Sequence, residues 1–237
     1  MKLKIGQEQQ GVLFLLLSGA LFGTMPLITK IAYKYGSNGY SAAFGRFFFG
    51  SVILFVLAKF VLRLSLSITR QELFEIIKMS LFYGLMPIFL YCSYDLIGTG
   101  LATTLHFTYP VLVLVLLRIF FKQKLERKHV FCAILCMLGI ACLYTPNGSV
   151  RLDGVLLAVA SGIVYAVYIV LLGKSVAKRL PVFVLSFWVS LFSSLEIGII
   201  TLLSGNMVTH MPAQGWIAEV ALAFFSTVVA LVFFQRW

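Results

Sequence analysis

The chain has 237 residues, of which 61% are hydrophobic and only 11% are charged, whereas about 25% of the residues of an average soluble domain are charged. This composition excludes an ordinary soluble domain and indicates a membrane protein. The net charge of +11 does not indicate nucleic-acid binding, because the basic residues are scattered between long apolar runs instead of forming one solvated patch.

Apolar segments long enough to span a bilayer recur along the whole chain. A helix crosses a hydrocarbon core about 30 Å thick with roughly 20 residues, and lipid forces the helical form because it offers no partner to backbone N–H and C=O groups. The sequence predicts eight such helices, at residues 11–33, 41–62, 75–97, 100–121, 130–146, 154–173, 182–204 and 216–236. We therefore expect an all-α polytopic protein of the cell membrane.

Basic residues are distributed unevenly between the two sides of the predicted membrane. If the N-terminus lies in the cytoplasm, the cytoplasmic segments hold fifteen Lys and Arg residues, and the outer segments hold only Lys30, Lys34 and Arg151. Cytoplasmic loops of membrane proteins carry such an excess of positive charge. We therefore expect both the N-terminus and the C-terminus in the cytoplasm.

The chain contains an internal repeat. A shift of 143 residues places GVLFLLLSG, residues 11–19, over GVLLAVASG, residues 154–162. The same shift matches further pairs, among them Phe44 with Phe187 and Ser51 with Ser194. Because one copy holds five helices, an odd number, the second copy enters the membrane from the opposite side. This predicts an inverted repeat, the construction of many secondary transporters.

The two copies differ in length. The first is expected to cover residues 1–146 with five helices, whereas the second, 154–237, holds three. Trp237 falls opposite Tyr94 at the repeat offset, so the fourth and fifth helices of the first copy have no counterpart. The eight predicted helices are thus expected to belong to a ten-helix protein with about fifty more residues.

Residues 100–125 read GLATTLHFTYPVLVLVLLRIFFKQKL. This segment begins with small residues, contains FTYPV and ends with the basic sequence FKQKL. Together with ten expected helices in two inverted copies, it resembles the EamA-type transporters of the drug/metabolite transporter superfamily. The resemblance implies transport of small metabolites or drug-like solutes by alternating access, often coupled to protons or to exchange. Gln123 stands where the family usually has a glutamate.

Ionisable side chains inside predicted helices indicate function, because each costs at least a few kcal/mol in the membrane. We identify Lys30, Arg46, Asp95, His106 and Glu196, all in the outer half of their helices. This placement predicts a polar vestibule that faces outward. Glu196 is the deepest carboxyl group and the first choice for a protonatable coupling or cation-binding group.

Each of these residues also has a structural interpretation. Lys30 is expected to extend to the outer interface, and Asp95 either caps its helix or belongs to the site. Arg46 either binds solute or pairs with Asp95 or Glu196, because a buried arginine needs a carboxylate. The unperturbed pKa of a histidine lies near neutrality, so His106 would suit proton coupling, but a single histidine also serves as a hydrogen-bonded packing residue.

Aromatic residues and a proline complete the candidate site. Tyr91 and Tyr109 are expected to line the cavity, although aromatic side chains near an interface also anchor helices. Pro110 interrupts its helix and is the best hinge candidate.

We find no enzyme motif, metal-ligand cluster or cofactor motif in the sequence. We expect a small solute and the lipid bilayer as partners. The alternative is a non-transporting membrane protein, a truncated product or a subunit completed by a homodimer or another chain.

Overall fold

A computed structural model describes residues 19, 23–123, 131, 134, 135, 138 and 151–229 of the chain. Within these residues there are helices and no strands. The α-helices are α2 (Gly39–Val56), α3 (Arg70–Ile97), α4 (Thr99–His106), α5 (Tyr109–Phe121), α7 (Leu152–Lys174), α8 (Val182–Leu203) and α9 (Ala213–Ala223), and residues 23–34 are also helical. Shorter turns of other helix types, η1 (Leu57–Val61), η2 (Val176–Arg179) and η3 (Phe224–Val229), follow α2, α7 and α9.

Five described helical segments are long and apolar enough to cross a membrane. They are Gly39–Val61, Arg70–Ile97, Thr99–Phe121, Leu152–Lys174 and Val182–Leu203, and they agree with the predicted helices of the same regions. Ala213–Val229 is a shorter apolar helix. The predicted helices at 11–33 and 216–236 lie only in part within the described residues, and 130–146 lies largely outside them, so the count of eight stays a prediction.

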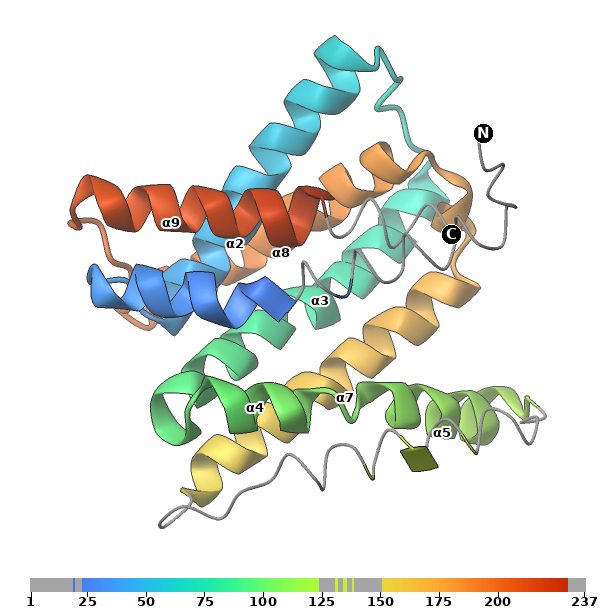
Figure 1. The fold of residues 1–237 in the computed structure, drawn as a ribbon. Helices are drawn as coiled ribbons and strands as arrows, with labels where there is room; N and C mark the ends of the chain where they lie inside the picture. Colours follow the sequence, from blue (N-terminus) through green and yellow to red (C-terminus); the bar gives the residue numbers. More distant parts are fainter. Residues whose placement is uncertain are drawn as a thin grey trace, which may run out of the picture.

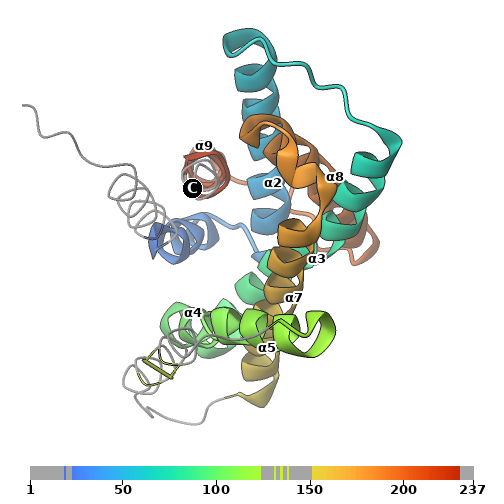
Figure 2. The same cartoon turned by 90° about the vertical axis from the view of Figure 1, so that its right-hand side faces the viewer.

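Helix α3 lies at the centre of the described fold and contacts α2, α7 and α8 (Figure 1). Helices α4 and α5 pack on α7, whereas α9 packs on α2 and lies beside the helix at residues 23–34 in both views (Figure 2). Helix α3 therefore contacts helices from both the early and the late part of the chain. This arrangement brings side chains from distant segments to one buried centre.

Local sequence determines where α3 begins and ends. Thr69 and Glu72 form a capping box, in which each side chain accepts a hydrogen bond from the backbone N–H of the other residue, at 3.2 and 2.7 Å. Such reciprocal caps satisfy two N–H groups that the first turn leaves without partners. At the other end, Gly98 adopts φ +77° and is the single residue between α3 and α4. A glycine tolerates this conformation without a steric cost.

The predicted helix at 100–121 is divided in two. Helix α4 ends at His106 and α5 begins at Tyr109, so that Phe107 and Thr108 interrupt the helix and Pro110 is the second residue of α5. Proline has no N–H to continue the hydrogen-bond ladder. Gly162 of α7 lies against this break, since a Cβ placed on it would be 3.0 Å from the carbonyl oxygen of His106. The break therefore lies in close contact with α7.

Candidate solute-binding site

Arg46 of α2 is completely buried at the centre of the fold. Its Nε donates to Oγ1 of Thr227 in η3 at 3.2 Å, and its terminal nitrogens donate to the hydroxyl oxygens of Tyr83 at 3.2 Å and Tyr91 at 3.4 Å. The sulfur of Met25 accepts a further hydrogen bond at 3.4 Å. These partners are all neutral, and they come from three helical segments: α3, η3 and the helix at residues 23–34.

Aromatic rings surround the guanidinium group. Its carbon lies 5.0 Å from the ring centre of Phe47 and 5.8 Å from that of Tyr83. The Tyr83 ring stacks on Tyr168 of α7 with 4.3 Å between the centres, and on Tyr165 with 6.2 Å. Ring faces carry negative electrostatic potential and attract a cation. We call Arg46, Tyr83, Tyr91, Tyr165 and Tyr168 the Arg46 cluster.

His106 extends the Arg46 cluster toward the break between α4 and α5. Its ring centre lies 5.5 Å from those of Tyr109 and Tyr165, and the Tyr109 and Tyr165 rings meet edge to face at 4.7 Å. Nδ1 of His106 shares a hydrogen bond of 2.9 Å with Oγ of Ser161 in α7, with the donor set by the tautomer. The predicted residues Tyr91, Tyr109, Arg46 and His106 thus belong to one continuous group, in which Tyr109 is half-buried and the others are buried.

The two predicted carboxyl groups lie apart from Arg46. Asp95 is exposed near the end of α3. Glu196 of α8 lies against Gly84, where a Cβ on the glycine would be 2.5 Å from Oε2. Oε2 is buried and has no hydrogen-bond partner among the described residues. The expected ion pair of Arg46 with Asp95 or Glu196 is absent from the described part of the chain, because neutral hydroxyls occupy the hydrogen-bonding positions around the guanidinium.

Glu219 of α9 is a buried acid that our sequence interpretation missed. Only 1% of the residue is exposed, and its Oε1 accepts a hydrogen bond of 2.7 Å from the hydroxyl of Ser37. Its other oxygen lies against Gly45 of α2, next to Arg46 in the sequence. The signal was available, because Glu219 is an ionisable residue within the predicted helix at 216–236.

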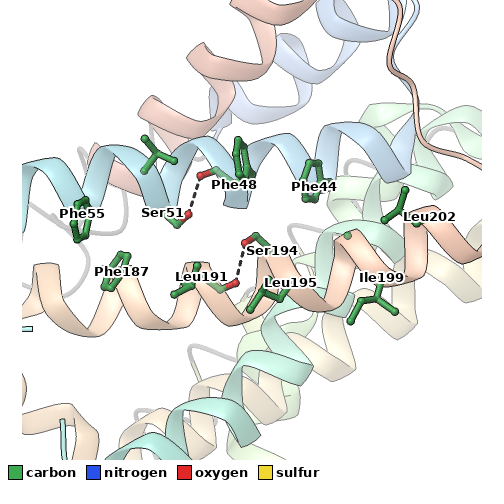
Figure 3. A pocket seen from close by; sticks show the side chains of 12 residues that line it. Phe44, Phe48, Ser51, Phe55, Phe187, Leu191, Ser194, Leu195, Ile199 and Leu202 are labelled. Atoms are coloured by element: carbon green, nitrogen blue, oxygen red, sulfur yellow. Dashed lines mark hydrogen bonds between the residues drawn. The ribbon is translucent and has the colours of Figure 1, made fainter. Parts of the chain in front are cut away.

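An apolar pocket of about 470 Å³ lies between α2 and α8 and is separate from the Arg46 cluster. Figure 3 shows phenylalanine, leucine and isoleucine side chains of both helices facing it, among them Phe44 and Phe187. The hydroxyls of Ser51 and Ser194 donate within their own helices, each at 2.8 Å. Two pairs that match at the repeat offset therefore line the same pocket from opposite sides.

Titratable groups of the described residues do not gather as metal ligands do. Within that part of the chain, no three His, Cys, Asp or Glu side chains lie close enough to hold one metal ion. The chemistry of the Arg46 cluster is instead that of hydrogen bonding, one positive charge and aromatic faces. Such a group suits the recognition of an organic solute.

Comparison with known proteins identifies the family. Residues 9–145, more than half of the chain, match the EamA-like transporter family. The chain is 27% identical over 176 residues to "Uncharacterized transporter YxxF" of Bacillus subtilis (strain 168), a match that covers 70% of this chain and 54% of that protein. The chain thus spans about half the length of this relative.

A solved crystal structure of a protein shares the fold. It superposes with a TM-score of 0.73 and 18% sequence identity over 95% of this chain and 77% of that chain. The helical architecture and the apolar helices agree with a multi-pass membrane protein. The chain therefore belongs to the EamA-like transporter family.

Proposed function

We propose that the protein is a secondary transporter that moves small solutes across the cell membrane by alternating access. The observation that carries this proposal is the Arg46 cluster, a buried polar and aromatic group within apolar membrane helices. Buried ionisable groups in such helices are expensive and are retained for function. Membership of a transporter family supports the same interpretation.

The composition of the Arg46 cluster fits two halves that move against each other. Arg46, Tyr83 and Tyr91 come from the predicted first repeat, whereas Tyr165 and Tyr168 come from the second. Inverted-repeat transporters hold solute between their halves near the middle of the membrane and rock the halves around it. We propose that the break between α4 and α5, with Pro110, is the hinge of this movement and that both termini face the cytoplasm.

We propose Glu196 as the proton-coupling group. Its carboxyl group lies within α8, and no donor among the described residues reaches the buried Oε2. A carboxylate without donors is poorly stabilised at this depth, so a proton is expected on Glu196 in this conformation. A movement of α8 relative to α3 that admits water to Gly84 would allow the proton to leave. Proton binding would then follow the conformational change.

Proteoliposomes that enclose a pH-sensitive dye test this proposal without knowledge of the substrate. Mixtures of carboxylates, amino acids, amines and nucleosides are added outside, and protein-dependent acidification is recorded. We expect one mixture to drive acidification in wild-type vesicles, and Glu196→Gln to abolish it while the protein remains folded in the membrane. Equal acidification with Glu196→Gln would remove Glu196 from the coupling role. Protein-free vesicles control for passive entry of weak acids.

The rival function is that of a subunit completed by another chain or by a second copy. Helices α4 and α5 cover α7, whereas the helix at residues 23–34, which the repeat matches with α7, exposes Leu27 by 65% and Ile31 by 49%. A helix of a partner would pack on this face. Single cysteines at Leu27 and Ile31 test the rival, since an interface would give specific crosslinked oligomers in native membranes and a lipid-facing surface would not.

A further inference from the structure

The positive charge of Arg46 is not balanced by any side chain among the described residues. Its acceptors are the hydroxyls of Tyr83, Tyr91 and Thr227 and the sulfur of Met25, which are all neutral. A buried charge without an opposite charge carries a large desolvation cost, which contact with an anion lowers. Arg46 is also the only Lys or Arg that is buried within the described part of the chain.

The carboxyl groups of the described residues do not pair with Arg46. Two of the eight acidic residues, Glu8 and Glu126, lie outside the described residues, and both fall in predicted cytoplasmic segments. The other six have other surroundings: Glu72 caps α3, Glu75 binds Lys78, Asp153 binds Arg151, Glu219 accepts from Ser37, Glu196 lies against Gly84, and Asp95 is exposed. An anion for Arg46 is therefore expected to come from outside the chain.

The tyrosines around Arg46 retain hydrogen-bond donors for such an anion. Tyr83 and Tyr91 accept from the guanidinium through their hydroxyl oxygens, and each hydroxyl keeps its own proton to donate. Tyr168, which is 2% exposed, has a buried hydroxyl without a partner among the described residues. The Tyr168 ring stacks on the ring of Tyr83, whose hydroxyl accepts a hydrogen bond from Arg46. A buried hydroxyl without a partner costs stability and suits a ligand that would accept from it.

We propose that the Arg46 cluster binds a small organic monoanion, whose carboxylate contacts the Arg46 guanidinium and accepts hydrogen bonds from the tyrosine hydroxyls. This inference rests on the proposed transport function and assigns its substrate class. A single buried guanidinium balances one negative charge, whereas a phosphate dianion would leave one charge unbalanced. The rings of Tyr165 and Tyr168, which stack on each other at 5.8 Å, provide apolar surroundings for the rest of the solute.

Binding is tested on the purified full chain in detergent by thermal stabilisation and by titration calorimetry. The probes are benzoate, its neutral analogue benzamide and the cation benzylammonium, which share one ring and differ in charge. Wild-type protein is expected to bind benzoate at least tenfold more tightly than either analogue. Arg46→Gln is expected to lower benzoate affinity more than tenfold and to abolish the preference for the anion.

Two further variants distinguish a loss of binding from a loss of folding. Tyr168→Phe removes only the hydroxyl without a partner, so it is expected to melt no lower than wild type while it weakens benzoate binding about tenfold. Tyr35→Phe, which lies outside the Arg46 cluster, is the matched control and is expected to bind benzoate as wild type does. Equal affinity for benzoate in wild type, Arg46→Gln and Tyr168→Phe would overturn the proposal, as would tighter binding of benzamide or benzylammonium.

Failure of this inference is distinguishable from failure of the transport function. Acidification of vesicles driven only by neutral or cationic solutes would overturn the anion assignment and leave the transporter in place. Arg46-dependent binding of benzoate without any solute-driven acidification would support the anion site, while it would contradict proton-coupled transport.

Discussion

Replacing Gly154 by alanine is expected to force α7 away from α3. A Cβ on Gly154 would lie 2.6 Å from Cγ2 of Ile97 and 2.7 Å from Cβ of Leu96. The Leu96 Cβ moves only with the backbone of α3, so the two helices must separate. Overpacking of this kind costs about 1–3 kcal/mol, and the better helix propensity of alanine returns at most about 1 kcal/mol. With the full return from helix propensity, the net loss is at most about 2 kcal/mol.

Gly173→Ala, in the same helix, is the matched control. No heavy atom of the described residues lies within 4 Å of a Cβ built there, so only the gain in helix propensity remains. Each kcal/mol moves the Tm of a chain of this size by roughly 2–4 °C. In thermal melts of purified protein in detergent, we expect Gly154→Ala to lower the Tm by up to about 8 °C and Gly173→Ala to leave it unchanged or raise it. Equal Tm values for the two variants would refute the close packing of α7 on α3.

Further predictions concern the helix break, the α3 cap and the buried acid. Gly162→Ala places a methyl group against the carbonyl of His106, so we expect slower solute-driven acidification of vesicles; an unchanged rate would contradict a moving break. Thr69→Ala removes one half of the capping box with Glu72, and we expect a loss of about 1 kcal/mol in thermal melts. Ser37→Ala leaves the buried Glu219 without its donor, and we expect a loss of about 1–3 kcal/mol, which Glu219→Gln is expected not to reproduce; similar Tm values for Ser37→Ala and wild type would count against this hydrogen bond.

Hydropathy alone predicted the long helices, because the length of an apolar segment is a property of consecutive residues. The segments predicted at 41–62, 154–173 and 182–204 agree with the described ones within a few residues. The interruption between α4 and α5 was anticipated only through Pro110. The observed break lies at Phe107 and Thr108, directly before α5, in which Pro110 is the second residue and has no N–H to donate.

The surroundings of Arg46 were harder to predict, since they depend on how helices are rotated against each other. The residue itself was identified because a charge in an apolar segment is conspicuous. Tyr83, Tyr165 and Tyr168 gave no such signal, since tyrosine is common in membrane helices and only packing brings the three rings together. Of the two interpretations of Arg46, pairing with Asp95 or Glu196 is not found among the described residues, where hydroxyl oxygens surround the guanidinium.

Solute-driven acidification of vesicles that contain wild type, Arg46→Gln or Tyr35→Phe tests the central claim most directly. The account predicts that Arg46→Gln abolishes the acidification, although the variant still inserts into the membrane and shows the thermal melt of a folded protein. Tyr35→Phe is predicted to give the same acidification as wild type. A response of Arg46→Gln equal to that of wild type would contradict the account, because solute would then cross the membrane without the Arg46 cluster.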